Sequence, residues 1–412
     1  MIGPFLRTYR NAFRGLSPSV WLLAGVMLIN RSGTMVLPYL TLYLTQHLHF
    51  SVTDAGIVMA VYGAGAFCGT FLGGRLTDRL GFYPVQFLSL LTAGFFLIGL
   101  QFLHDFYVIC ATVFVYTLVG DAFRPANSAA VAHYSTAENR TRAYSMNRLA
   151  INLGWSVGGG LGGLLAGIDY SLLFWVDGLT CVAAAAVLRL YLPKPAAPVL
   201  SRDPLAEDVP PIRSPYRDGL YLAFAFFTML NAVVFMQLFS LVPLYFKQVL
   251  LLKETQIGLL MTMNGLLIVA VEMAFVYAVE RRYPAGKVRL ISGGVAAIGL
   301  SYLLLLTGNW PGVAVVMVLL NTFGEMMSMP FMQAFSVERS DERSRGQYLA
   351  VYSMAYAIAQ IAAPALGSQI VERAGFLTLW VAAAGICALS AAGFWWLSGQ
   401  VRTGVSREVS VS

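Results

Sequence analysis

Long apolar stretches alternate with short polar segments along nearly the whole chain. A helix that crosses the hydrocarbon core of a bilayer needs about 20 apolar residues in a row. The pattern therefore predicts an all-α integral membrane protein. Its twelve expected transmembrane helices, called spans 1 to 12, cover residues 19–45, 52–76, 83–103, 106–132, 142–167, 170–192, 218–246, 254–279, 287–307, 310–335, 345–371 and 374–398.

The polar positions within this pattern occur twice, in the same order and at a nearly constant separation. The repeated pairs include Thr53 and Thr255, Gly56 and Gly258, Gly120 and Gly324, Asp121 and Glu325, and Tyr144 and Tyr348. Parallel repeats in a membrane chain are a feature of transporters built from two six-helix halves. We expect six-helix bundles over residues 1–192 and 218–412. The proline-rich segment 193–217 is expected to be a cytoplasmic linker between them.

Composition and charge agree with a membrane protein. Of the 412 residues, 58% are hydrophobic and 11% are charged, whereas soluble domains have about 25% charged residues. Most of the 27 Lys and Arg residues lie in the N-terminus, the even-to-odd connections and the C-terminus. By the positive-inside rule, both termini are cytoplasmic. The basic balance therefore suits an inner membrane of a bacterium and its lipids, and not nucleic acid.

The connection between spans 2 and 3 holds the sharpest local motif, Gly73-Gly74-Arg75-Leu76-Thr77-Asp78-Arg79-Leu80-Gly81. Gly74 and Gly81 permit close helix approach and a tight reversal of the chain. Asp78 lies near the start of the third span, where a helix N-terminus favours an anion.

This run resembles the G-x-L-x-D-R-x-G loop of the major facilitator superfamily, and Phe82 and Tyr83 stand where that family usually has basic residues. The resemblance covers the whole chain and implies a transporter that works by alternating access. It implies a conformational gating role for Gly74, Asp78, Arg79 and Gly81.

Span 5 carries a surface of small residues, Gly154-Trp155-Ser156-Val157-Gly158-Gly159-Gly160-Leu161-Gly162-Gly163. Small residues let helix backbones approach closely. The run resembles the G-x-x-x-G-P-x-x-G-G motif of the drug–proton antiporters of the superfamily, with Gly159 in the place of the proline. The resemblance adds Gly158 and Gly162 to the expected gating residues.

Few ionisable residues lie inside the spans, and each one at mid-membrane depth costs at least about 2.5 kcal/mol on insertion scales. Arg31 lies in span 1, and Asp121 and Arg124 lie at i and i+3 in span 4. Glu272 and Glu325 have no basic residue at i±3 or i±4, so we expect proton coupling at Glu325, with Asp121 and Glu272 as alternatives. Asp177 is expected to cap or pair locally.

In the superfamily, spans 1, 4, 7 and 10 line the central cavity. With an aromatic and methionine wall added, the expected substrate-binding residues are Arg31, Asn30, Tyr39, Arg124, Asn231, Met236, Asn321 and Tyr356. The repeat also places Asp121 and Glu325 at equivalent positions, so we expect the two acids to face each other across a pseudo-twofold axis.

The sequence favours a proton-coupled secondary transporter that expels amphipathic or drug-like small molecules by antiport. Uptake by symport of a peptide, sugar or organic anion is the alternative, because a central arginine suits a carboxylate or phosphate. A membrane receptor or enzyme without transport is the alternative from another class. The His and Cys positions show no metal spacing, and the chain lacks a P-loop. We therefore expect no enzyme activity, no cofactor, no metal and a monomer.

Overall fold

The computed structural model describes residues 15–136, 139–194, 214–282, 287–308, 310–340 and 345–409. These residues form helices joined by short connections and contain no β-strand. The helices are α2 (Pro18–Gly33), α3 (Val36–Leu42), a π-helical turn (Tyr43–His47), α4 (Val52–Leu80), α5 (Phe82–Leu100), α6 (Phe106–Gly120), α7 (Phe123–His133), α8 (Arg140–Ala166), α9 (Ser171–Tyr191), a 3₁₀ turn (Pro215–Arg217), α10 (Gly219–Ser240), α11 (Val242–Gln248), α12 (Glu254–Arg282), α13 (Lys287–Leu304), α14 (Gly312–Arg339) and α15 (Arg345–Val409).

Eleven helical segments in the described part are long and apolar enough to cross a membrane. The last of them, Gln347–Gln400, has 54 residues, which as one helix would measure about 80 Å. Gly375 interrupts this segment with φ 80° and ψ 170°, so α15 consists of two membrane-crossing helices. The twelve predicted spans are thereby confirmed. The predicted domain boundary at residues 193–217 stays a prediction, because residues 195–213 lie outside the described part.

Polar caps fix where several of these helices begin. The Ser17 hydroxyl accepts a hydrogen bond from the Val20 backbone N–H at 3.3 Å, directly before Pro18 at the first turn of α2. Asp105 accepts from Val108 N at 3.0 Å to start α6. Such caps satisfy N–H groups that have no partner inside the helix, so the first turn can form where the chain enters the membrane.

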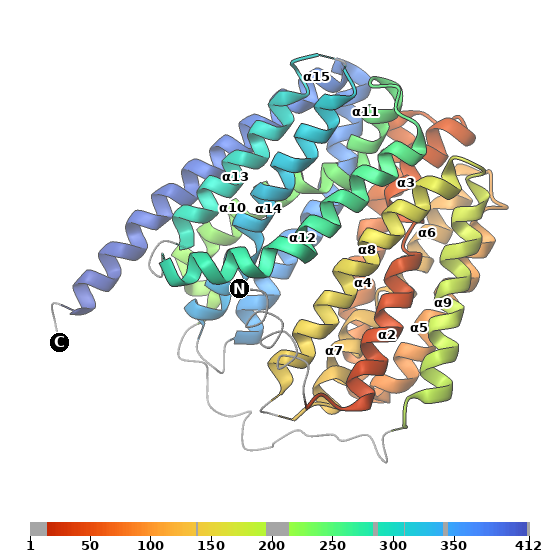
Figure 1. Cartoon of the computed structure of the whole chain (residues 1–412), viewed down its shortest axis with the longest axis horizontal. Helices are drawn as coiled ribbons and strands as arrows, with labels where there is room; N and C mark the ends of the chain where they lie inside the picture. The colour runs from red at the N-terminus through yellow and green to blue at the C-terminus, as the bar shows by residue number, and fades with distance from the viewer. Residues whose placement is uncertain are drawn as a thin grey trace, which may run out of the picture. The chain divides into compact units, whose positions relative to one another are not determined.

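The described chain separates into two compact units. The first comprises residues 1–39, 61–201 and 254–266, and the second comprises residues 40–60, 202–253 and 267–412. Both units therefore take a part of α4 and a part of α12. Within the first unit, α2 packs on α8 and α9, and α5 packs on α6, α7 and α9 (Figure 1).

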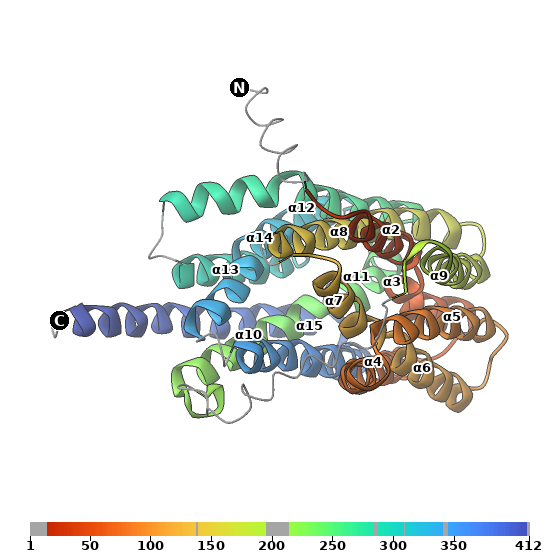
Figure 2. The ribbon, with the colours of Figure 1, turned by 90° about the horizontal axis from the view of Figure 1, so that it is seen from below.

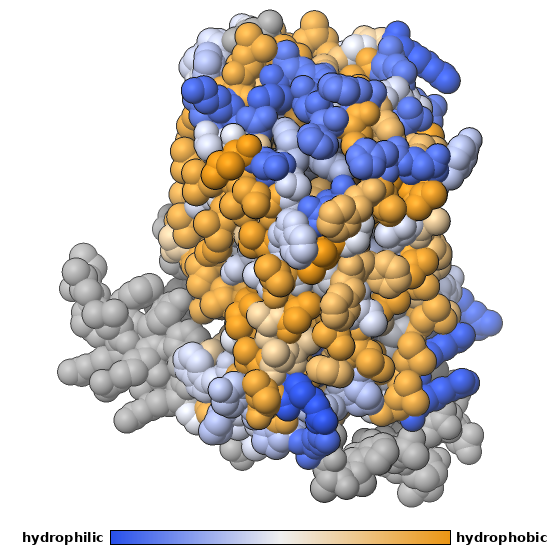
Figure 3. Space-filling model, turned by 90° about the vertical axis from the view of Figure 1, so that its right-hand side faces the viewer, coloured by the Kyte–Doolittle hydropathy of each residue, from blue (hydrophilic) through white to orange (hydrophobic). Residues whose placement is uncertain are grey.

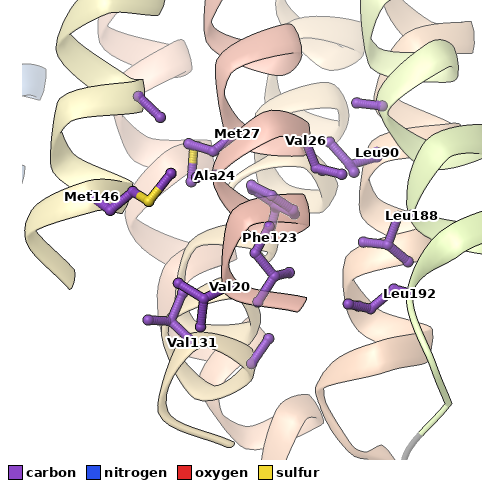
Figure 4. Close-up of a cluster of buried hydrophobic side chains, with 14 of the residues drawn as sticks. Val20, Ala24, Val26, Met27, Leu90, Phe123, Val131, Met146, Leu188 and Leu192 are labelled. Atoms are coloured by element: carbon purple, nitrogen blue, oxygen red, sulfur yellow. The ribbon is translucent and has the colours of Figure 1, made fainter. Parts of the chain in front are cut away.

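The core of the first unit is apolar and closely packed. Val20 and Met27 of α2 meet Leu90 of α5, Phe123 of α7 and Leu188 of α9, and all five are buried (Figure 4). With Met146 of α8, the cluster joins five helices, so it stabilises the helices that carry the polar residues described below.

Within the second unit, α10 and α13 pack along α15, and α13 packs against α14 (Figure 2). Close approach between α13 and α14 depends on small residues. A Cβ atom added to Gly294 would lie 2.7 Å from the Gly324 carbonyl oxygen, and one added to Gly324 would lie 2.6 Å from the Gly294 carbonyl oxygen. This is the small-residue packing typical of membrane helices.

Apolar side chains cover the outside of the molecule as well as its core. On the face shown in Figure 3, they fill the middle, and hydrophilic side chains gather toward the two ends. Phe95, Leu190 and Trp395 are 62%, 73% and 64% exposed. Exposed apolar surface of this extent marks contact with a membrane, which here is lipid around the helices.

Candidate functional site

Two spans of the first unit are interrupted near the residues that the sequence singled out. In span 1, α2 ends at Gly33 and α3 begins at Val36, with Arg31 in the last turn of α2. In span 4, α6 ends at Gly120 and α7 begins at Phe123, and Asp121 lies between them. Interrupted membrane helices expose backbone groups only where protein or a polar cavity surrounds them. The breaks therefore locate a polar site inside the first unit.

Asp177 of α9 accepts hydrogen bonds from the backbone at the break in span 1. Its Oδ2 accepts hydrogen bonds from the backbone N–H groups of Met35 and Val36, each at 3.2 Å. Its side chain is buried, with the residue 3% exposed. The N–H groups at the start of a helix have no partner within it, and Asp177 supplies one for α3. Asp177 was expected to cap or pair locally. It does cap a helix, but that helix lies in span 1, 141 residues away in sequence.

Asp121 forms an ion pair at the break in span 4. Its Oδ1 lies 2.5 Å from Arg124 Nε, and the Arg124 side chain is 48% exposed while that of Asp121 is 10% exposed. The spacing of three residues brings the two side chains to one face of the helix. The carboxylate is thus buried and the guanidinium reaches out of the packed interior.

A cavity of about 50 Å³ lies between these elements. It is lined by Asn30, Arg31, Thr34, Tyr62, Ser89, Leu90, Ala93, Tyr116, Thr117, Gly120, Asp121, Phe123, Asp177 and Cys181. All of these residues belong to the first unit. The cavity therefore unites three sequence candidates, Asn30, Arg31 and Asp121, inside one unit.

Arg31 differs from the other residues of the cavity because it has a buried donor without an acceptor. Its Nε is buried without a hydrogen-bond acceptor, and its guanidinium forms no ion pair with a described residue. The neighbouring Asn30 side chain donates a long hydrogen bond of 3.4 Å to Cys181 Sγ. A buried donor without an acceptor is rare in folded proteins and needs an explanation.

Tyr62 and Tyr116 are cavity residues that the sequence did not single out. Their rings meet edge to face with centroids 6.2 Å apart, and neither hydroxyl forms a hydrogen bond to the described part of the chain. A single tyrosine in an apolar span is ordinary membrane composition. Only the packing of α4 and α6 around the cavity reveals that these two face a shared polar space.

The small residues of span 5 contact two different partners. A Cβ added to Gly154 would lie 2.4 Å from Arg31 Cβ, and one added to Gly158 would lie 3.1 Å from the Arg31 carbonyl oxygen. On the other side of α8, a Cβ on Gly163 would lie 2.7 Å from Gly258 Cα of α12. Helix α8 thus approaches the break in span 1 with one row of glycines and α12 with another.

Gly162 and Tyr39 lie in the same packing. A Cβ on Gly162 would lie 2.9 Å from the Tyr39 ring. The Tyr39 hydroxyl donates a hydrogen bond to the Gly159 carbonyl at 3.0 Å, and the residue has no exposed surface. Tyr39, expected to touch substrate, is here a buried packing residue.

The candidates in the second unit differ in their hydrogen bonding. Asn321 donates to Ser301 Oγ at 3.1 Å, while neither amide atom of Asn231 has a partner. The Tyr356 hydroxyl is also buried without a partner. Met236 is partly buried on α10. These positions stay predictions as substrate contacts.

The two remaining carboxylates differ from Asp121 in their backbone setting. Glu325 is partly buried within the uninterrupted helix α14, and Glu272 is 8% exposed within α12. Each has an interaction with other groups. Whether Glu325 faces Asp121 stays a prediction.

The loop between spans 2 and 3 is shorter than expected, because α4 continues to Leu80 and α5 begins at Phe82. Gly81 connects them with φ 83°, a conformation that favours glycine. Gly74 has open space where a Cβ would stand, and Arg79 is exposed. The Asp78 side chain lies outside the described part, so its predicted role stays a prediction.

Twelve membrane-crossing helices, with polar residues gathered at breaks in two of them, define a multi-pass membrane protein with an architecture typical of solute transporters. The family model of the Major Facilitator Superfamily matches residues 20–253 and 238–409. The chain belongs to this superfamily, as the sequence motif predicted.

The relatives are distant but cover most of the chain. The uncharacterized MFS-type transporter YttB of Bacillus subtilis (strain 168) is 24% identical over 357 residues, which are 86% of this chain and 88% of that protein. A Na(+), Li(+), K(+)/H(+) antiporter of Planococcus maritimus is 25% identical over 373 residues, 83% of this chain and 87% of its own.

Solved structures show the same fold. The crystal structure of a POT family transporter in complex with a thioalcohol-conjugated peptide superposes with a TM-score of 0.77. The match covers 94% of this chain and 98% of the other at 13% identity. At that identity the similarity defines the fold alone.

Proposed function

We propose that this chain is a proton-coupled secondary transporter of a bacterial inner membrane, with both termini in the cytoplasm. It expels amphipathic or drug-like small molecules by antiport through alternating access. The observation that carries the proposal is the ion pair of Asp121 and Arg124 at the edge of the cavity that Arg31 also lines.

Charge balance supports a coupling role for Asp121. A carboxylate inside the membrane is expensive without a cation, and Asp121 has one in Arg124 at 2.5 Å. The break between α6 and α7 allows the backbone around Asp121 to move without disrupting a continuous helix. When such movement separates the pair, Asp121 takes up a proton to stay in the apolar interior, and it releases the proton when the pair forms again.

The antiport direction has support from the relatives. The Planococcus maritimus protein carries the name of an antiporter that exchanges monovalent cations for protons. We therefore include Na⁺, Li⁺ and K⁺ beside lipophilic cations among the compounds to test.

The test uses the purified full chain in liposomes that contain a pH-sensitive dye and hold an imposed pH gradient. Sodium, lithium, potassium, ethidium and tetraphenylphosphonium are added in turn. We expect at least one of them to dissipate the gradient in the direction of exchange. A gradient that no probe changes, in liposomes where the chain is shown to be folded, contradicts proton antiport of these cations.

Three variants then locate the coupling residue, namely Asp121→Asn, Glu325→Gln and Glu272→Gln. The cavity and the ion pair favour Asp121, because Asp121 lines the cavity and pairs with Arg124, whereas the sequence placed Glu325 first. The coupling variant is expected to lose gradient-driven transport and keep binding. Glu338→Gln, which changes a 54% exposed carboxylate paired with Lys287, serves as the control.

Uptake by symport is a second candidate, and Arg31 Nε, which is buried without a hydrogen-bond acceptor, favours it. A substrate carboxylate would supply the acceptor that Arg31 lacks. The direction of proton flow in the same liposomes separates the two, because a symporter moves protons with the substrate.

A further inference from the structure

We infer that the cavity in the first unit is a subsite for a small anionic group, either a free ion or the carboxylate of a transported molecule, and that it binds this group together with a proton. The inference deepens the second candidate function, uptake by symport, and rests on it, because a transported anion that binds together with a proton is carried in the same direction as that proton. Its test needs no transport, so the two can fail separately.

The cavity wall has an excess of hydrogen-bond donors. Arg31 Nε has no acceptor, and the hydroxyls of Tyr62 and Tyr116 have none in the described part of the chain. All three residues line the cavity. A ligand that satisfies them must present acceptor atoms, and an arginine fork is especially suited to a carboxylate.

Several acceptors on the cavity wall are already engaged. Asp121 Oδ1 pairs with Arg124, and Asp177 Oδ2 accepts from the N–H groups of Met35 and Val36. The hydroxyls of Thr34 and Thr117 donate to carbonyl groups of their own helices. Arg31 Nε is the buried donor of the wall that lacks an acceptor, and an anion would supply one.

The size limits the ligand. A cavity of about 50 Å³ has room for roughly three or four water molecules. Formate, acetate, chloride or one carboxylate group of a larger molecule fits this volume, whereas a sugar acid does not. The subsite thus recognises one group of a substrate and not a whole substrate.

The charged groups around the cavity make the affinity for an anion depend on the protonation of an aspartate. The titratable and charged groups that face the cavity or pair with its wall are Arg31, Arg124, Asp121, Asp177, Tyr62, Tyr116 and Cys181. With both aspartates ionised, the two arginines are balanced, and an added anion meets repulsion from both carboxylates. When one aspartate is protonated, the cavity carries a net positive charge. Binding of the anion and of the proton therefore strengthen each other by linkage.

The experiment measures thermal unfolding of the full chain in lipid nanodiscs, at constant ionic strength set with sodium HEPES, which carries no carboxylate. Formate, acetate and chloride are titrated at pH 5.5 and pH 8. We expect saturable stabilisation by the small anions, with tighter apparent binding at pH 5.5. Stabilisation that is absent, or that is unchanged between the two pH values, overturns the inference.

Conservative variants test the named donors. Tyr62→Phe and Tyr116→Phe each remove one hydroxyl and keep the ring, so the apparent affinity is expected to fall roughly 2- to 10-fold. Arg31→Lys keeps the charge and loses the planar fork, and a reduction in apparent anion affinity of roughly 10-fold or more is expected.

Tyr302→Phe, which removes a buried hydroxyl bonded to Val234 in the second unit, is the control and should keep wild-type anion affinity. Equal affinities in the three cavity variants and the wild type contradict the site.

Asp177→Asn separates the charge of this residue from its hydrogen bonds, since it retains an oxygen for the backbone N–H groups and removes a negative charge. It is expected to increase anion affinity at pH 8 and to reduce the difference between the two pH values. A purely structural Asp177 would give lower stability with no gain in affinity, and that result contradicts the proposed charge linkage.

The source of the anion is decided with matched pairs of carboxylic acids and their primary amides. If the group belongs to a transported molecule, acids stabilise the chain more than the amides and formate competes with them. If a free ion is the ligand, formate acts alone and each acid behaves like its amide. Both results support the subsite.

Discussion

Asp177 Oδ2 lies 3.2 Å from the backbone nitrogen of Val36 and thereby joins span 6 to the start of the second half of span 1. The same oxygen accepts from Met35 N at 3.2 Å. One side chain on α9 thus stabilises the interrupted backbone next to Arg31. This contact makes the stability of the first unit depend on a single buried carboxylate.

Replacing Asp177 by alanine is expected to lower the free energy of unfolding by about 2–4 kcal/mol, because two buried N–H groups lose their acceptor. Asp177→Asn keeps an acceptor and should lose only about 1 kcal/mol. Thermal unfolding of both variants in detergent measures the difference. If alanine and asparagine are equally mild, the hydrogen bonds to the break do not stabilise the fold.

Asp218 provides a prediction on pH. Its carboxylate caps α10 by accepting from Tyr221 N at 3.1 Å, and it holds Arg339 through two hydrogen bonds of 2.7 and 3.0 Å. The Tyr348 hydroxyl donates a further bond of 3.0 Å. Burial raises the pKa of this carboxyl, and the hydrogen bonds, that from Arg339 foremost, lower it by more, so the pKa lies below 3.8.

A depressed pKa in the folded state means that Asp218 contributes stability above the pKa of the unfolded chain, about 3.9, and loses it as the pH falls through the folded value. Asp218→Asn should therefore reduce stability at pH 7 by about 1 kcal/mol, discounted for partial exposure of Arg339. The variant and the wild type should unfold at the same temperature below about pH 3. A difference that persists at that pH would show that capping, and not charge, is responsible.

The number of spans and the family could be predicted from the sequence because both depend on local features. A run of apolar residues is sufficient to specify a membrane helix, and the pattern around Gly74 and Gly81 is contiguous. The breaks in spans 1 and 4 also have a local signal, which the span prediction did not use. Pro38 and Pro125 follow Thr34 and Asp121 by four residues, and a proline removes the hydrogen bond to the carbonyl four residues earlier. The partner that stabilises the break in span 1 could not be predicted, because Asp177 lies far away in sequence.

The residues of the cavity could also be predicted only in part from the sequence. Arg31 and Asp121 were evident as charges in apolar spans, but Tyr62 and Tyr116 join them only through the packing of α4 and α6. The repeat was also misleading in one respect. Asp121 and Glu325 are equivalent in sequence, yet Asp121 lies at a helix break and Glu325 lies within a continuous helix. Equivalent positions in a duplication need not have equivalent backbones.

The motif between spans 2 and 3 contains two glycines with different backbone conformations, which allows a comparison of their alanine variants. Gly81 has φ 83°, and Gly74 is helical, with no atom within 4 Å of the place where a Cβ would stand. Gly81→Ala is expected to cost about 1–3 kcal/mol through backbone strain. Gly74→Ala should be neutral or stabilise α4 by about 0.5–1 kcal/mol. Comparison of the unfolding temperatures measures both effects, and a Gly74→Ala variant that is stable but inactive would support the gating role that the motif implies.

Helices α8 and α12 approach each other through glycines. A Cβ on Gly163 would lie 2.5 Å from the Glu254 carbonyl oxygen and 2.7 Å from Gly258 Cα. These are backbone atoms, which cannot move aside as a flexible side chain can, so Gly163→Ala must push the helices apart. We expect a loss of about 1–3 kcal/mol in stability, together with altered transport, because the contact involves a helix that also touches Arg31.

Gly25→Ala on α2 has open space around the added methyl group and serves as the control. It should match the wild type or exceed it by about 0.5–1 kcal/mol. If both alanine variants behave alike in unfolding and in transport, the close approach of α8 and α12 is not what the glycines of span 5 provide.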